Sequence, residues 1–126
     1  MELPGWRHFL GPAVVCVRGP SRSGKTTLSS ALIAELRQRG RSVAYAKRTH
    51  HLLDLPEKSS SRIWLAGPQA MVLRASDRIQ LTLPPGDGTA AALLAQLPGG
   101  IDVVILETHE PEPFPTLLST AYAPSP

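Results

Sequence analysis

The first part of the chain sets two short apolar runs on either side of a long amphipathic segment. Residues 13–17 are apolar and mostly β-branched, and the apolar residues at 28, 32, 33 and 36 recur with the period of a helix. A second apolar run, 42–46, follows Gly40, which can adopt the left-handed conformation that ends helices. The pattern predicts a strand, a helix over about 25–39 and a second strand, an order that gives a parallel pair with a right-handed crossover.

The second part of the chain predicts shorter elements. We expect a helix over 62–66 that stops at Gly67, and then two strands, 70–75 and 78–83, joined by a two-residue turn. A helix over 90–97 follows. The last elements are a near-continuously apolar strand over 101–107 and a short edge strand over 114–118. The second strand of the hairpin alternates apolar and polar residues, so we expect it to join the sheet as an edge or half-exposed strand. The sheet is then mixed.

The turn after the first strand fits a phosphate-binding loop. Residues 19–26 have the spacing Gly, four residues, Gly-Lys and Ser or Thr, between a strand and a helix as such loops require. Gly19 and Gly24 let the backbone turn and approach phosphate oxygens, Lys25 supplies a mobile ammonium, and the Thr26 hydroxyl is placed to bind Mg²⁺. The predicted fold class is therefore α/β, a phosphate-loop NTPase-like three-layer fold with a mostly parallel, mixed sheet flanked by helices.

Nucleotide contacts are expected from this loop and from the end of the second predicted strand. Arg22 faces either phosphate or solvent, Thr27 belongs to the first helical turn, and Lys47 is either a phosphate ligand or a solvated lysine. The expected nucleotide-binding set is Gly19, Ser21, Arg22, Ser23, Gly24, Lys25, Thr26, Thr27 and Lys47.

Glu107 is the second chemical signal. It ends the predicted buried strand, where phosphate-binding enzymes place an acid that orients Mg²⁺ or its water, and parallel strand ends meet at one edge of the sheet. We therefore expect Lys25 and Glu107 to be catalytic. The expected metal ligands are Thr26, Glu107 and Asp54, although Asp54 equally suits the cap of a turn.

Composition and charge bear on the number of domains, on nucleic-acid binding and on the location of the protein. A chain of 126 residues suits one domain, 1–126, with residues 1–12 as a loose lead-in and 119–126 as a disordered tail. The net charge of +3 is scattered and no aromatic residues interleave with it, so we predict no nucleic-acid binding. One cysteine, no apolar stretch of membrane length and no signal-peptide pattern predict a cytoplasmic protein without membrane contact.

Two adjacent histidines, His50 and His51, raise the possibility of structural zinc. Adjacent residues in a strand-like segment point in opposite directions, and no cysteine or second ligand pair has the usual zinc spacing. We therefore do not predict a zinc site.

With these motifs in order, the chain resembles the family of molybdopterin-guanine dinucleotide biosynthesis protein B (MobB), a small phosphate-loop nucleotide-binding family, over about residues 13–118. The segments that carry the resemblance are Gly19–Thr27, Arg39-Gly40, Val43-Ala44, Lys47–His51, Asp54–Ser60 and Ala66-Gly67. The Lys-x-Thr-His-His pattern at Lys47–His51 discriminates far more sharply than the phosphate loop.

The chain departs from the family pattern at two places. The family has Glu-Gly-Phe-Lys after the buried strand, whereas this chain has Glu107-Thr-His-Glu110, which keeps the acid, loses the glycine and reverses the charge of the lysine. Arg48 replaces a histidine, and the loop after His51 is two residues shorter.

The resemblance implies a GTP-binding, weakly hydrolysing homodimer that uses Mg²⁺. It also implies a partner, the companion molybdopterin guanylyltransferase (MobA-like) that attaches GMP to molybdopterin. The Asn-Lys-x-Asp motif by which regulatory GTPases read guanine is absent, so the residues alone predict only Mg²⁺-dependent binding of a nucleoside triphosphate.

Two other functions fit the same residues. A small kinase of a nucleoside or another small molecule would use Glu107 as base, but it needs an arginine-rich lid, and residues 57–69 offer only Arg62. A nucleotide-gated interaction module, in which slow hydrolysis is incidental, is the third hypothesis.

Overall fold

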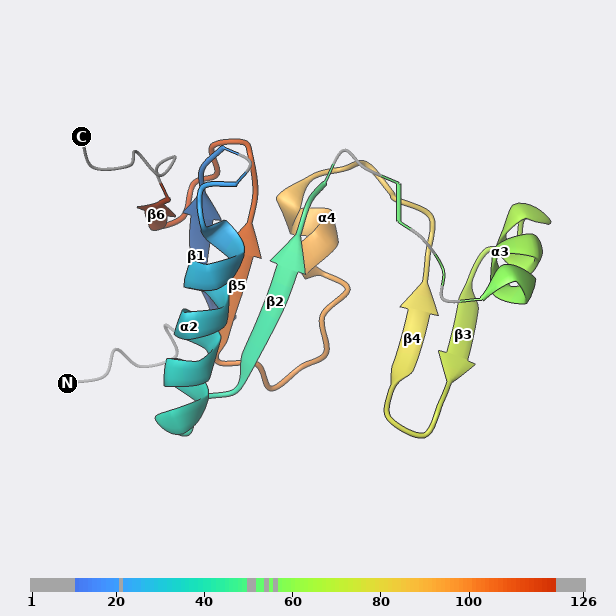
Figure 1. Ribbon diagram of the computed structural model, residues 1–126, viewed down its shortest axis with the longest axis horizontal. Coiled ribbons are helices and arrows are strands. Elements are labelled where there is room, and N and C mark those ends of the chain that lie inside the picture. Colours follow the sequence, from blue (N-terminus) through green and yellow to red (C-terminus); the bar gives the residue numbers. More distant parts are fainter. Residues whose placement is uncertain (1–10, 21, 50–51, 54, 56, 120–126) are drawn as a thin grey trace.

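The computed structural model describes residues 11–20, 22–49, 52–53, 55 and 57–119. Strands and helices both occur along the chain (Figure 1), and the strand pairs β3–β4 and β5–β6 follow one another without a helix between them. The bounds are β1 Ala13–Arg18, α2 Lys25–Gln38, β2 Val43–Lys47, α3 Lys58–Leu65, β3 Met71–Arg74, β4 Ile79–Thr82, α4 Ala90–Leu94, β5 Val103–Glu107 and β6 Thr116–Leu118.

The central sheet has the strand order β2, β5, β1, β6, and each neighbouring pair is parallel. The apolar run of β5 is buried, as a strand with neighbours on both sides should be. The register places Val17 of β1 and Lys47 of β2 opposite Glu107 of β5. The carboxyl ends of these three strands therefore lie level with one another.

Helices cover both faces of this sheet. On one face, Cys16, Ala46, Val104 and Leu106 form the core with Ala90 of α4. Figure 1 shows α2 on the other face, where it contacts β1, β2 and β5. The predicted α/β fold, a mostly parallel sheet flanked by helices, is confirmed.

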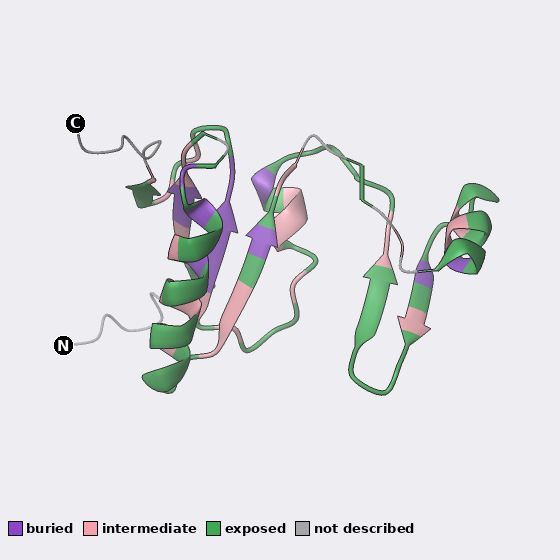
Figure 2. Cartoon of the chain, in the orientation of Figure 1, coloured by how far each residue is buried: buried purple, intermediate pink, exposed green. Residues whose placement is uncertain are grey.

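The position of the hairpin corrects one prediction. β3 and β4 pair antiparallel around the predicted turn at Ser76-Asp77, but they form a separate two-stranded sheet and do not join the central one. Figure 1 shows this sheet beside α3, and Figure 2 shows that most of it is exposed. Alternation of apolar and polar residues identifies a strand with one covered face; it does not say which element covers that face.

The end of β6 corrects a second prediction. Ser119, which we assigned to a disordered tail, donates its backbone N–H to the Arg18 carbonyl at 2.6 Å and its hydroxyl to the Ser23 carbonyl. The rest of the predicted tail, 120–126, and most of the lead-in, 1–10, lie outside the described residues. The single-domain organisation stays a prediction.

Within the described ranges, no helix is long and apolar enough to cross a bilayer.

Candidate functional site

The phosphate loop leaves the start of α2 open to an anion. Gly24 has φ 91°, in the left-handed region, and Arg22 has φ 60°. Among the residues that the structure describes, no side chain caps the helix, and its first turn contains no acidic residue. The first N–H groups and the positive end of the helix dipole are thus available to a negatively charged ligand.

Lys25 is folded onto the loop that precedes it. Its side chain is largely buried, with the residue 8% exposed, and Nζ donates to the Gly19 carbonyl at 2.6 Å and to the Pro20 carbonyl at 3.4 Å. A buried ammonium needs such acceptors, and phosphate oxygens are stronger ones. Lys25 is therefore placed to exchange loop carbonyls for phosphate.

Gly19 is required by close packing as well as by the turn. A Cβ at this position would lie 2.0 Å from the Ser119 carbonyl oxygen and 2.7 Å from Ser23 Oγ. The Ser23 hydroxyl is itself buried without a hydrogen-bond partner. The loop thus rests against the end of β6, which holds it from the side.

A pocket of about 220 Å³ joins the phosphate loop to the ends of β2 and β5. The lining residues come from two places. Arg22, Lys25 and Thr26 belong to the loop and the first turn of α2, and Lys47, Arg48, Thr49, Glu107, Thr108 and His109 end or follow β2 and β5. Four of these side chains are cationic and one is a carboxylic acid. The pocket suits a small ligand with several negative charges.

The structure brings five of the predicted site residues to this pocket: Arg22, Lys25, Thr26, Lys47 and Glu107. Gly19, Ser23, Gly24 and Thr27 belong to the loop or the first helical turn but do not line the pocket. Ser21, Asp54 and the two histidines of the zinc alternative lie outside the described residues.

The Glu107 carboxylate has a partner that the sequence did not reveal. Glu107 is 2% exposed, and the Tyr45 hydroxyl donates a hydrogen bond to its Oε2. Burial and the neighbouring Glu107 carboxylate raise the pKa of Tyr45 above its ordinary value, so the phenol stays a donor throughout the neutral range. Tyr45 precedes Lys47 by two residues, and side chains two apart share one face of a strand.

Tyr45→Phe should therefore destabilise the fold by about 1–2 kcal/mol, because a buried carboxylate loses its donor. The pKa of Tyr45 is higher in the folded chain than in the unfolded chain, where it is about 10. The contribution of Tyr45 to the free energy of unfolding is therefore complete at pH values below the pKa of the unfolded chain. It is lost as the pH rises through the pKa of the folded chain. Urea unfolding of both chains at pH 7 and above pH 10 measures this. A difference in stability that is absent at pH 7 would contradict the role given to Tyr45.

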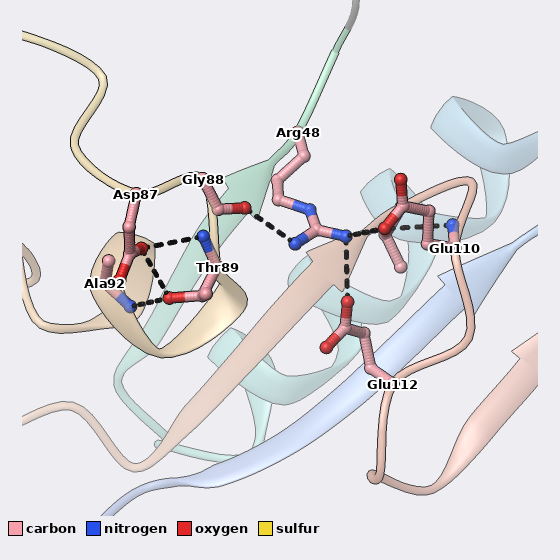
Figure 3. A network of polar contacts seen from close by, with 8 residues as sticks. Arg48, Asp87, Gly88, Thr89, Ala92, Glu110 and Glu112 are labelled. Atoms are coloured by element: carbon pink, nitrogen blue, oxygen red, sulfur yellow. Dashed lines mark hydrogen bonds and ion pairs between the residues drawn. The ribbon is translucent and has the colours of Figure 1, made fainter.

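The two departures from the family pattern lie in contact (Figure 3). Arg48 Nη2 lies 3.0 Å from Glu110 Oε2 and 2.8 Å from Glu112 Oε2, and Nη1 donates to the Gly88 carbonyl at 3.0 Å. The arginine at position 48 and the glutamate at position 110 thus form an ion pair in this chain. The sequence analysis did not identify Glu112, and it identified Thr108 only as part of the segment that departs from the family pattern.

The pocket contains donors of the type that Mg²⁺ prefers. The Thr26 hydroxyl and the Glu107 carboxylate supply oxygen atoms to the lining of the pocket. Among the described residues, no group of three His, Cys, Asp or Glu side chains could hold a metal ion. A magnesium ion here would therefore depend on phosphate oxygens and water for its remaining ligands, as it commonly does.

The parallel sheet, the glycine-rich turn after β1 and the helix α2 define an α/β protein with a phosphate-loop-like fold. The model of the family described as molybdopterin guanine dinucleotide synthesis protein B, MobB, matches residues 14–119. The chain belongs to the MobB family.

Solved structures agree with this fold. The MobB protein homolog from Bacillus stearothermophilus is 24% identical, with a TM-score of 0.65 over 85% of this chain and 63% of its own. Bacillus subtilis MobB is 22% identical, with a TM-score of 0.61 over 83% and 63%. A molybdopterin-guanine biosynthesis protein B is 25% identical, with a TM-score of 0.59 over 75% and 60%. The chain thus spans less than two thirds of these proteins. No curated protein matches it.

Proposed function

We propose that this chain is a GTP-binding accessory protein of molybdenum cofactor biosynthesis, in the step that forms molybdopterin-guanine dinucleotide, with weak Mg²⁺-dependent GTP hydrolysis. One observation carries the nucleotide part of the proposal: a single cation-rich pocket joins the phosphate loop to Glu107. Membership of the MobB family supports guanine as the base and molybdopterin-guanine dinucleotide synthesis as the setting.

Five of the residues that line the pocket have a role in this proposal. Lys25 and the open start of α2 bind the phosphates, with Lys47 and Arg22 as further cations. Thr26 and Glu107 hold Mg²⁺ or its water, and the ion, when bound, neutralises charge on the phosphates. Tyr45 orients Glu107.

The proposal extends to assembly and location. We expect the chain to form a homodimer and to bind a companion molybdopterin guanylyltransferase. Both expectations rest on the family alone. A cytoplasmic location fits the free, buried thiol of Cys16, which a reducing compartment preserves.

Calorimetric titration with GTP and ATP, each with and without Mg²⁺, tests the proposal. We expect GTP with Mg²⁺ to bind at least about tenfold more tightly than ATP, a difference of about 1.4 kcal/mol. Absence of Mg²⁺-dependent GTP binding would contradict the proposed function.

Phosphate assays then separate the alternatives. Release of free phosphate without transfer to an acceptor counts against a kinase. An interaction module is favoured instead if Lys25→Ala abolishes partner binding while Glu107→Ala leaves partner binding intact.

A further inference from the structure

Arg48 joins three segments that are distant in the sequence. It follows the last residue of β2, its Nη1 donates to the Gly88 carbonyl in the turn before α4, and its Nη2 lies against Glu110 and Glu112, which follow β5 (Figure 3). Nη2 also lies 3.5 Å from Thr108 Oγ1. Both terminal nitrogens of this guanidinium are thus engaged with protein acceptors.

The two carboxylates on Arg48 differ in burial. The side chain of Glu112 is 13% exposed and that of Arg48 is 21% exposed, whereas the side chain of Glu110 is 63% exposed. Water screens an exposed pair almost completely, while a shielded pair keeps most of its attraction and is costly to break. Glu112 is therefore the main anchor of Arg48.

This arrangement makes Arg48 a poor phosphate ligand, although it lines the pocket. Its charge is already offset by two carboxylates, and its Nη1 donates to Gly88. A phosphate would have to compete with Glu112 for a guanidinium that is bound at 2.8 Å. The arginine is better suited to hold neighbouring segments in place.

The segment that Arg48 holds begins with two residues that line the pocket, Thr108 and His109. Thr108 is 2% exposed and lines the pocket, its N–H donates to the Val17 carbonyl at 3.1 Å, and its hydroxyl accepts from the Glu110 N–H at 3.1 Å. Phosphate loops cradle the first two phosphates, and the third extends toward the strand-end acid. In a bound triphosphate, the wall formed by Glu107, Thr108 and His109 would therefore face the third phosphate.

We propose that Arg48 is a positioning residue whose pairing with Glu112 fixes the segment that carries the pocket wall of Thr108 and His109, so that preference for a nucleoside triphosphate over a diphosphate depends on this pair. The inference rests on the proposed function and deepens it. A diphosphate is held by the loop alone and does not reach the wall. Its binding should therefore not depend on the pairing of Arg48 with Glu112.

The test measures the dissociation constants of GTP and GDP, both with Mg²⁺, for the unmodified chain and for the variants Arg48→Met and Glu112→Gln. Each variant should lower the preference for GTP over GDP by about tenfold, with the GDP constant changed by less than about twofold. Arg39→Met is the matched control, because Arg39 pairs with Glu35 on the exposed surface of α2 and should leave the preference unchanged.

The Glu112→Gln variant distinguishes positioning from direct binding. If Arg48 bound phosphate itself, release from Glu112 would increase the preference for GTP, whereas a positioning role predicts a decrease. An increase, an unchanged preference, or equal loss of GTP and GDP would overturn the inference. Glu112→Gln preserves shape, so the test stands even if Arg48→Met does not fold.

The two proposals fail in different ways. If the unmodified chain binds neither nucleotide, the proposed function is contradicted and this inference falls with it. If the unmodified chain prefers GTP and both variants keep that preference, only the inference is contradicted.

Discussion

Lys25→Ala is expected to weaken nucleotide binding by roughly a hundredfold to a thousandfold. The ammonium of Lys25 is buried beside the loop and already donates to two carbonyls, so it is preorganised to donate to phosphate. Hydrogen bonds from a charged donor contribute about 1.5–3 kcal/mol each, and two of them at about 1.5–2 kcal/mol account for this loss. Calorimetric titration with Mg²⁺ and GTP measures it.

The control for this variant is Lys58→Ala, which removes an exposed lysine at the start of α3. It should bind as the unmodified chain does. Near-normal binding by Lys25→Ala would show that the ligand does not enter the phosphate loop. A circular dichroism spectrum of each variant checks that the loss does not come from unfolding.

Gly19→Ala is expected to destabilise the fold by about 2–4 kcal/mol, because the new Cβ would overlap a backbone atom. The atom is the Ser119 carbonyl oxygen, 2.0 Å from the ideal Cβ position. A backbone carbonyl cannot move aside as a flexible side chain can. The backbone of Ser119 is also fixed by the hydrogen bond that its N–H donates to the Arg18 carbonyl. The midpoint of urea denaturation should fall accordingly.

Gly99→Ala is the matched control for this prediction. A Cβ at Gly99 meets nothing within 4 Å, and Gly99 does not have a positive φ. Its effect should stay within about 0.5 kcal/mol. If Gly19→Ala were as stable as Gly99→Ala, the end of β6 would not pack against the phosphate loop.

Much of the fold was predictable because its signals are local. The apolar run of residues 101–107, the helical period after Gly24 and the glycines that end α2 and α3 each define an element from a few neighbouring residues. The sheet to which the hairpin belongs was not predictable. Its alternation is satisfied equally by an edge of the central sheet and by a small separate sheet.

The candidate site likewise contains residues that local sequence signals predict and residues that only the long-range pairing of strands brings together. Lys25 and Glu107 could be predicted because a spacing rule and a strand end mark them. Tyr45 reads as an ordinary strand residue, and its contact with Glu107 depends on β2 pairing with β5, which are 62 residues apart at that contact. Arg48 and Glu110 were visible only as separate departures from the family. Their pairing belongs to the same long-range arrangement.

Mapping of amide chemical shifts during titration with Mg²⁺ and GTP is the most direct test of the central claim, that one pocket joins the phosphate loop to the end of β5. We predict the largest shifts at residues 19–27 and 107–109, with smaller ones at Lys47 and Arg48 and little change in the hairpin β3–β4. Shifts centred on the hairpin and α3, with the loop and Glu107 unchanged, would contradict the account.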